Sequence, residues 1–354
     1  MKVNPEFRTE EKALDLYNGP LLELVFRAAA VHREFHNARE VQMSSLISIK
    51  TGGCPEDCGY CPQSIKYDTG LNNHGMLSVE EVVEFAKNAQ CNGSSRVCMG
   101  AAWREVRDNR DFDKVVRMVS EINKMGIEVC ATLGMMNEDQ AKRLKNAGLY
   151  AYNHNLDSGK EFYSEIISTR EFDQRLDTIE NARKAGISVC SGGIIGMGES
   201  VNDRIGMLVT YAAMENPPES IPINALVAVE GTPLENQKPV STWEMVRMIA
   251  TARIMFPESI IRLSAGRTVM SQEAQALCFL AGASSVFAGD KLLTTPNPEY
   301  NEDMELFEIL GLIPKLPFQD GDQPVSLPDE TITSSNTKRI RPKSGFSPRK
   351  ISVD

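Results

Sequence analysis

Three cysteines, Cys54, Cys58 and Cys61, lie close together in one Gly-rich and Pro-rich stretch of the chain. Thiolates spaced in this way can hold three corners of a cubane iron–sulfur cluster, which leaves the fourth iron without a protein ligand. Gly52 and Gly53 let the backbone pass close to such a bulky core. The spacing therefore predicts a cluster with one open iron that can bind a small molecule.

Two other arrangements of the three thiols are open at this point. A zinc site is one, because Cys-x2-Cys pairs commonly bind zinc, and His74 is the nearby candidate for a fourth ligand. A disulfide is the other, although three clustered cysteines leave one thiol over. The spacing favours the open cluster over both.

Composition limits the class of protein. The chain has 354 residues, 42% of them apolar, and a net charge of −10, which argues against nucleic acid or an anionic membrane as partner. There is no run of roughly 20 apolar residues, and the charged N-terminus has no apolar signal-peptide core. With eight cysteines, these features predict a soluble protein of a reducing compartment, the cytoplasm.

The chain alternates short β-branched runs with helical patterns. Residues 9–37 carry two helical patterns, and later helices are followed by Gly126, Gly148 and Gly186, where a left-handed cap belongs. Strands are expected at Ser45–Lys50, Arg96–Met99, Ile127–Ala131, Ala151–Leu156, Ser188–Ser191, Ile221–Val229, Ile260–Leu263 and Ser284–Ala288. Helices are expected at Ser78–Asn88, Phe112–Lys124, Asn137–Asn146, Phe172–Ala185, Val201–Glu215, Thr242–Met255 and Ser271–Leu280.

Eight strand–helix units predict an α/β fold of the (β/α)8 TIM-barrel type. An open doubly wound sheet is the competing fold, but it usually has a phosphate-binding glycine turn after its first strand, where this chain has cysteines. We expect a helical extension over residues 1–40, the barrel over 41–315, and a disordered or loosely packed polar tail over 316–354.

Three further cysteines, Cys98, Cys130 and Cys190, each follow a valine on a predicted strand. Because strand residues alternate between faces, the repeated Val-Cys pair could turn all three sulfurs into the barrel. Arg262 lies at a similar level on the seventh strand. Together these groups could hold a second, smaller cluster.

Each of these residues taken alone has a plainer interpretation. A lone strand cysteine is usually a small buried apolar residue, and a lone arginine usually forms an ion pair. The hypothesis depends on the shared phase of three strands. Cys91 and Cys278 lack that phase, and we expect them to be packing residues.

The sequence resembles the biotin synthases, a family within the radical S-adenosylmethionine superfamily. The resemblance extends over roughly residues 10–315 and is carried by the Cys54-x3-Cys58-x2-Cys61 signature and by four further segments: Arg96–Trp103, Tyr150–Asp157, Val189–Glu199 and Arg262–Arg267.

The resemblance implies roles for particular residues. Cys54, Cys58 and Cys61 would hold a [4Fe–4S] cluster that chelates S-adenosylmethionine. Cys98, Cys130, Cys190 and Arg262 would hold a [2Fe–2S] cluster, with Arg262 either ligating iron or donating hydrogen bonds to sulfide. The remaining groups would contact nucleoside or substrate: Asn155 and Asp157 the ribose or the substrate, Asn224 the ureido ring of dethiobiotin, Ile194 and Val227 the adenine with backbone near Tyr60, and Glu199 within an adenosine-contact motif.

Some of these residues have structural interpretations as well. Glu199 could mark a strand-to-helix turn near a helix N-terminus. His154 is expected to be a structural histidine rather than a catalytic one.

The implied reaction is radical insertion of sulfur into dethiobiotin to form biotin. The implied partners are dethiobiotin, an electron donor such as a flavodoxin or ferredoxin system, and a second copy of the chain in a homodimer. Two alternatives stay open: another radical S-adenosylmethionine barrel with an auxiliary cluster, and an iron–sulfur carrier protein.

Overall fold

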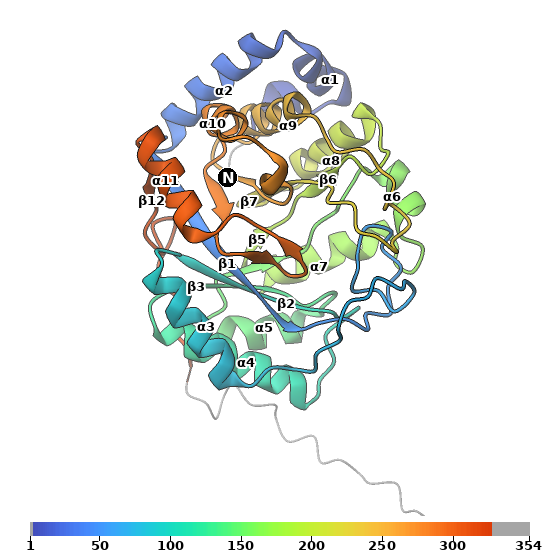
Figure 1. Ribbon diagram of the computed structural model, residues 1–354, viewed down its shortest axis with the longest axis vertical. Helices are drawn as coiled ribbons and strands as arrows, with labels where there is room; N and C mark the ends of the chain where they lie inside the picture. Colours follow the sequence, from blue (N-terminus) through green and yellow to red (C-terminus); the bar gives the residue numbers. More distant parts are fainter. Residues whose placement is uncertain (1–2, 328–354) are drawn as a thin grey trace, which may run out of the picture.

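Short runs of buried residues form the parallel strands of a closed barrel. The computed structural model describes residues 3–327 (Figure 1). The barrel strands are β1 (Glu40–Lys50), β2 (Arg96–Ala101), β3 (Glu128–Thr132), β4 (Ala151–Asn153), β5 (Ser188–Cys190), β7 (Ser220–Ala225), β8 (Ile260–Leu263) and β9 (Ser285–Phe287). They pair in this order, and β9 pairs with β1 through Gln42 and Ser285, which closes the barrel.

Four short strands lie outside this ring. β6 (Gly193–Ile195) extends the pairing along β7, and β12 (Ile313–Pro314) pairs with the beginning of β1. β10 (Lys291–Leu292) and β11 (Thr295–Pro296) form an antiparallel hairpin. This hairpin follows β9, so it lies at the C-terminal end of the barrel strands.

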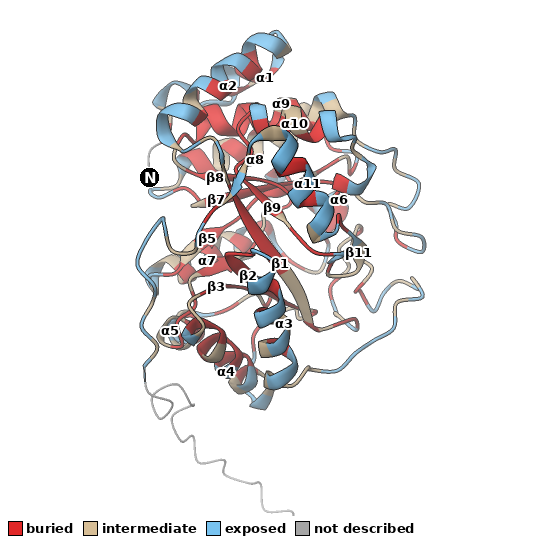
Figure 2. Ribbon diagram, turned by 60° about the vertical axis from the view of Figure 1, so that its left-hand side comes forward, coloured by how far each residue is buried: buried red, intermediate tan, exposed pale blue. Residues whose placement is uncertain are grey.

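The helices surround the barrel and bury their apolar faces against it (Figure 2). They are α1 (Glu10–Asn18), α2 (Leu21–Phe35), α3 (Val79–Cys91), α4 (Arg110–Lys124), α5 (Glu138–Asn146), α6 (Lys160–Ile166), α7 (Phe172–Lys184), α8 (Val201–Ala213), α9 (Thr242–Met255), α10 (Gln272–Leu280) and α11 (Tyr300–Leu310). α1 and α2 lie outside the ring and pack on α8 and α9.

Local sequence signals explain where these helices begin and end. Ser78 and Glu81 form a reciprocal capping box at the start of α3. Gly126, Gly148 and Gly186 have φ angles of 73°, 98° and 72°, so each provides the left-handed turn after its helix. The prediction of glycine caps before β3, β4 and β5 is therefore confirmed.

The (β/α)8 barrel is confirmed, with differences in detail. β1 begins at Glu40, β4 ends at Asn153, and β7 ends at Ala225, while α6, α11 and the β10–β11 hairpin were not predicted. Within residues 3–327, none of the helices is long and apolar enough to cross a membrane. Residues 328–354, most of the expected tail, lie outside the described part of the chain.

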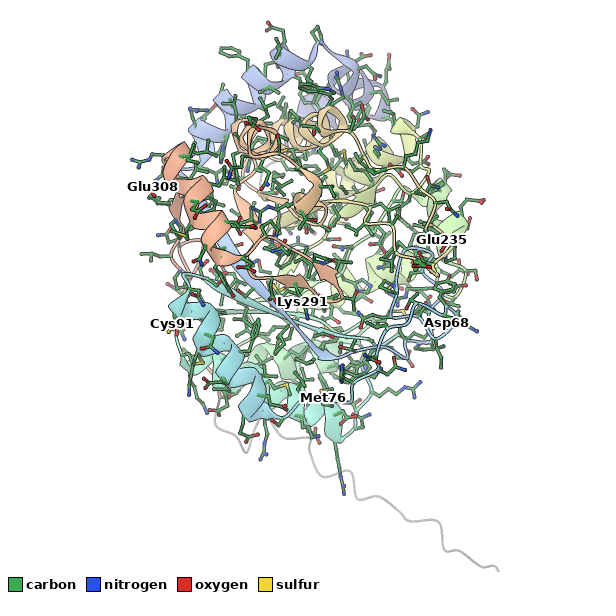
Figure 3. All side chains as sticks on the ribbon, in the orientation of Figure 1. Asp68, Met76, Cys91, Glu235, Lys291 and Glu308 are labelled. Atoms are coloured by element: carbon green, nitrogen blue, oxygen red, sulfur yellow. The ribbon has the colours of Figure 1, made fainter. Side chains whose placement is uncertain are left out.

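One expectation about the cysteines is wrong. Cys278 is buried and packs in the core as predicted, but Cys91 is exposed at the end of α3 (Figure 3). The helical register explains the difference, because α3 buries Val82, Ala86 and Ala89 and turns Cys91 outward.

Candidate active site

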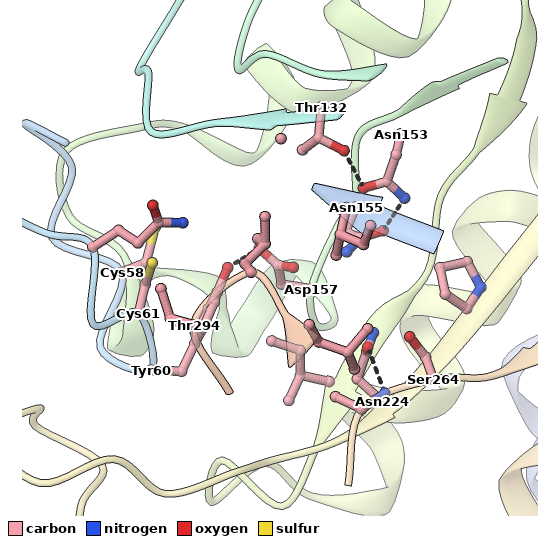
Figure 4. A pocket seen from close by; sticks show the side chains of 18 of the residues that line it. Cys58, Tyr60, Cys61, Thr132, Asn153, Asn155, Asp157, Asn224, Ser264 and Thr294 are labelled. Carbon is pink, nitrogen blue, oxygen red and sulfur yellow. Dashed lines mark hydrogen bonds between the residues drawn. The ribbon is translucent and has the colours of Figure 1, made fainter. Parts of the chain in front are cut away.

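A cavity of about 340 Å³ opens at the C-terminal end of the barrel (Figure 4). Its lining includes the loop after β1 and residues from strands on all sides of the ring. The predicted site residues in this lining are Cys54, Cys58, Tyr60, Cys61, Cys98, Cys130, Asn155, Asp157, Ile194, Asn224, Val227 and Arg262. The volume suits a small-molecule site, and the location is the one that barrel enzymes use.

The loop that carries the three clustered cysteines is fixed by its own backbone and by the barrel. The Cys54 amide donates to the Gln63 carbonyl at 2.9 Å, and the Gly59 amide donates to the Ile166 carbonyl at 2.8 Å. Gly52 has a φ of 76°, and a Cβ there would lie 1.7 Å from Asn73 Oδ1. The loop conformation therefore requires glycine at this position.

A buried ion-pair network ties the same loop to the barrel wall. Glu56, between the first two cysteines, contacts Arg104 at 3.1 Å and Arg170 at 3.3 Å and accepts a hydrogen bond from Thr169. Asp57 accepts from the backbone amides of Ser168 and Thr169 at 2.9 and 3.1 Å. These contacts hold the three thiols at the edge of the cavity.

Burial raises the pKa of each clustered thiol, to about 12 for Cys58 and about 11 for Cys61. Burial likewise raises the pKa of Cys54. These thiols are therefore protonated at neutral pH in the absence of iron, and iron binding must release their protons.

The strand cysteines lie together inside the barrel. Cys98 on β2 and Cys130 on β3 are directly paired in register, and both line the cavity. Cys190 on β5 is fully buried, and Asn153 Nδ2 donates to its Sγ at 3.3 Å. The cysteine side chains of the Val-Cys pairs therefore point into the barrel, as expected. Cys190, however, is not part of the cavity lining.

Arg262 on β8 is buried with a relative exposure of 1%. Its guanidinium donates to Ser285 Oγ at 2.9 Å and to Gln42 Oε1 and Ser44 Oγ at 3.3 Å. It takes part in none of the ion pairs found among residues 3–327. A buried cation without a carboxylate needs another source of negative charge, and an anionic thiolate cluster beside it would provide one.

Cys98 and Cys130 influence each other's ionisation in opposite directions. The hydrogen bond from the Cys130 thiol, with smaller contributions from Arg262 and Arg96, outweighs the opposing effect of burial and lowers the pKa of Cys98 to about 7. The same hydrogen bond, followed by burial, raises the pKa of Cys130 well above its ordinary value. The pocket therefore favours a thiolate at Cys98.

The arrangement does not suit a single metal ion. Across the described part of the chain, no three His, Cys, Asp or Glu side chains are grouped closely enough to hold one ion. The clustered cysteines and His74 form no such group among these residues, and the backbone of His74 pairs with Thr51. Two separated sets of three thiols fit clusters better than a lone ion.

A polar wall faces the clustered cysteines across the cavity (Figure 4). Asp157 Oδ2 accepts from the Tyr60 hydroxyl at 2.7 Å and forms an ion pair with Arg175 Nη2 at 2.7 Å. Asn155 Oδ1 accepts from the Gly192 amide at 3.1 Å, and Asn224 Nδ2 donates to the Gly193 carbonyl at 2.9 Å. These bonds fix the orientation of each side chain before any ligand binds.

Glu199 and His154 differ in where they lie, because His154 lines the cavity and Glu199 does not. Glu199 is outside the cavity lining; it accepts from the backbone amides of Gly196 and Met197 and pairs with Arg204 at 2.6 Å. It therefore braces the turn before α8. Burial keeps the pKa of His154 well below its ordinary value, its ring lies beside Tyr152, and its Nε2 has no hydrogen-bond partner among the described residues, so its structural role stays a prediction.

The structure adds groups that the sequence analysis missed. The β10–β11 hairpin brings Leu292, Leu293, Thr294 and Thr295 to the cavity, and Arg170 and Arg175 also line it. The hairpin had a usable signal, because loops after barrel strands form the functional face. The arginines had none, since they lie before and within an ordinary amphipathic helix.

Two family models match most of the chain. Residues 48–210 match the Radical SAM superfamily, and residues 222–313 match the Biotin and Thiamin Synthesis associated domain. The biotin synthase of Cytophaga hutchinsonii is 61% identical over 316 residues, which cover 89% of this chain and 94% of the relative. The mitochondrial biotin synthase of Arabidopsis thaliana is 53% identical, covering 93% of this chain and 87% of the relative.

Solved structures show the same fold at low sequence identity. Methylornithine synthase superimposes with a TM-score of 0.74 at 21% identity, covering 87% of this chain and 94% of that structure. An FeFe-hydrogenase maturase from Carboxydothermus hydrogenoformans superimposes with a TM-score of 0.75 at 18% identity, covering 87% and 76%.

Proposed function

The chain belongs to the biotin synthase family of the radical S-adenosylmethionine superfamily, and from this premise we propose how its own residues insert sulfur into dethiobiotin to form biotin. One observation carries the proposal. A single cavity is lined both by the clustered cysteines and by strand cysteines that lie beside a buried Arg262 without a carboxylate partner.

The donor sets fit two clusters. A [4Fe–4S] cluster on Cys54, Cys58 and Cys61 with S-adenosylmethionine would supply a 5′-deoxyadenosyl radical, and a [2Fe–2S] cluster on Cys98, Cys130, Cys190 and Arg262 would supply sulfur. Arg262 offsets the negative charge of the strand thiolates. Because a guanidinium stays protonated and has no lone pair to donate, we propose that it acts through hydrogen bonds to sulfide.

The polar wall orients the reacting molecules. We propose that Asn155 and Asp157 bind the ribose or the substrate, that Asn224 binds the ureido ring, and that Ile194 and Val227 contact the adenine. Tyr60 and Arg175 hold the Asp157 carboxylate in place. Positioning of this kind matters because a reactive group attacks the carbon that lies nearest.

The barrel and its hairpin exclude water from the reaction. Cys98, Cys130 and Cys190 are buried, and Leu292 and Leu293, in and next to the hairpin strand β10, contribute apolar side chains to the cavity lining. Apolar side chains around a reactive intermediate limit its contact with water and so protect it from side reactions.

The experiment is anaerobic reconstitution of the chain, followed by iron and sulfide analysis, a visible spectrum and an assay with dethiobiotin. We expect two cluster types and biotin formation. Cys54→Ala should lose the first cluster and the activity, whereas Cys91→Ala, which alters the exposed cysteine of α3, should keep both. A wild-type chain with a single cluster type, or without biotin formation, would refute the proposal.

The remaining partners are proposals that rest on the family. An electron donor of the flavodoxin or ferredoxin type would reduce the first cluster, and the chain would form a homodimer. We propose a reducing compartment such as the cytoplasm, because all eight cysteines are free. Sedimentation analysis of the purified chain tests the dimer.

A further inference from the structure

The segment after β12 crosses the barrel at the end opposite the cavity. Residues 315–327, here called the strap, begin where the Lys315 amide donates to the Val41 carbonyl at 2.9 Å. The Phe318 amide donates to Glu128 Oε1 at 2.7 Å, and the Leu327 amide donates to the Asn146 carbonyl at 2.9 Å. Val41 and Glu128 lie at the beginnings of their strands and Asn146 ends α5, so the strap covers the N-terminal mouth of the barrel.

One polar layer separates the strap from the strand cysteines. Arg96 and Glu128 stand two residues before Cys98 and Cys130 on β2 and β3, so each shares the inward face of its cysteine. The two side chains form a buried ion pair at 2.7 Å, and Gln42 Nε2 donates to Glu128 Oε2 at 3.2 Å.

Phe318 links the strap to this layer. Its ring meets the Tyr150 ring edge-on with centroids 5.6 Å apart, and the Arg96 guanidinium lies 5.4 Å from the centre of the Tyr150 ring. On β2 and β3, Arg96 is paired in register with Glu128, and Cys98 is paired with Cys130 two residues further along the same inward face. Arg96 is therefore close to the sulfurs on one side and to the strap on the other.

The strap is held mainly by hydrogen bonds rather than by buried apolar surface. Leu316, Val325 and Leu327 have relative exposures of 67%, 85% and 43%. Ser326 and Pro324 bond to the C-terminal ends of α4 and α5, and Lys315 pairs with Asp320 at 2.6 Å. A segment with so few buried contacts opens at a small fraction of the free energy of global unfolding.

We propose that the N-terminal mouth of the barrel is the route by which ferrous iron and sulfide reach the strand-cysteine site, and that the strap opens and closes this route. The inference rests on the proposed function, in which the chain gives up a sulfur that has to be replaced. During that reaction the other end of the barrel is filled by substrate and nucleoside.

The layer beneath the strap suits both species chemically. The oxygens of Glu128 and Gln42 are donors that ferrous iron accepts, and the Arg96 guanidinium attracts an anionic hydrosulfide. When the strap is closed, Arg96 and Glu128 pair with each other, so that neither charged side chain is buried without a partner.

The experiment compares three reconstituted holoenzymes: wild type, Phe318→Ala, and Val325→Ala as the matched control on the exposed side of the strap. Two rates are measured for each: the loss of the second cluster to an iron chelator, and its recovery after one turnover with ferrous iron, isotopically labelled sulfide and an added one-electron oxidant that takes up the electrons released when the iron becomes ferric. We expect Phe318→Ala to accelerate both rates about tenfold, since an aromatic pair contributes roughly that factor to closure. The first cluster, at the other end of the barrel, should be lost at the wild-type rate in all three proteins.

Equal rates in wild type and Phe318→Ala would overturn the inference, as would parallel acceleration at both clusters, which indicates general destabilisation. If Phe318→Ala assembles no second cluster, Asp320→Asn loosens the strap at Lys315 instead and is read by the same criteria. A wild-type protein without a second cluster would fail at the proposed function, so the two failures are distinguishable.

Discussion

Replacing Arg262 by methionine tests whether this residue stabilises the second cluster or the fold of the chain. In the metal-free chain the guanidinium is buried and makes three hydrogen bonds, all to neutral side chains. Each such bond contributes about 1 kcal/mol, whereas the desolvation of a buried ion costs several kcal/mol. We therefore expect Arg262→Met to have a small effect on the free energy of unfolding of the metal-free chain. The expected effect lies between a decrease of about 1 kcal/mol and an increase of about 2 kcal/mol.

The second cluster should respond in the opposite direction. Arg262 is positioned to balance the thiolate charge, and its loss should lower retention of this cluster at least tenfold, which is about 1.4 kcal/mol. Arg262→Lys, which keeps the charge, should retain more of the cluster than Arg262→Met. Our proposal is that Arg262 acts through hydrogen bonds to sulfide, and on that proposal Arg262→Ala should still assemble some of the second cluster.

Arg267 provides the matched control, since it is equally buried but paired with the buried carboxylate of Asp303. Arg267→Met leaves that carboxylate unpaired and should destabilise the chain by about 3 to 5 kcal/mol. Denaturant unfolding of the metal-free proteins and the visible spectra of the reconstituted proteins provide both readouts. A large loss of stability in Arg262→Met with normal cluster content would refute this reasoning.

Three further predictions follow from other contacts. Cys190→Ala should abolish biotin formation and leave the first cluster intact, which an assay and the iron content check; normal biotin output would exclude Cys190 as a ligand of the sulfur donor. Asp157→Asn leaves Arg175 without its counter-charge and should lower the stability by about 3 kcal/mol and weaken S-adenosylmethionine binding, whereas Tyr60→Phe should cost about 1 kcal/mol. Burial, followed by Arg253, lowers the pKa of His32 from 6.5 to about 3, so the unfolded chain binds more protons between these values and stability falls as the pH drops through this window. His32→Leu should remove up to about 1.4 kcal/mol per pH unit of that loss in acid unfolding curves, and an unchanged slope would contradict the assignment.

The sequence was sufficient for the barrel and for the phase of its cysteines. Parallel strands fix inward and outward positions by alternation, so the Val-Cys pairs of β2, β3 and β5 could be placed without knowing the fold in detail. The glycine caps worked for a similar reason, because a left-handed residue after a helix is a local requirement. Strand alternation and glycine caps depend on only a few neighbouring residues, so both could be predicted here without knowledge of tertiary contacts.

The parts that were missed depend on distant partners. Arg175 belongs to the site because α7 places its guanidinium next to the carboxylate of Asp157. The residues that neighbour Arg175 in the sequence do not indicate this contact. β1 starts at Glu40 because β12 pairs with its first two residues from far along the chain. Glu199 matched a motif, yet its carboxylate is occupied by the turn that contains it.

The interior of this barrel shows why such sites are recognisable from structure. Barrel interiors are ordinarily filled by layers of branched apolar side chains, which pack without polar demands. Here Gln42, Arg96, Glu128 and Arg262 occupy inward positions instead, next to three buried thiols. Arg96 and Glu128 pair with each other, whereas Arg262 has only neutral hydrogen-bond partners and the Phe287 ring, and no carboxylate among residues 3–327 balances its charge. A buried charged side chain that has no counter-charge within the protein lowers stability. Such side chains are expected at functional sites, where a bound group can supply the missing charge.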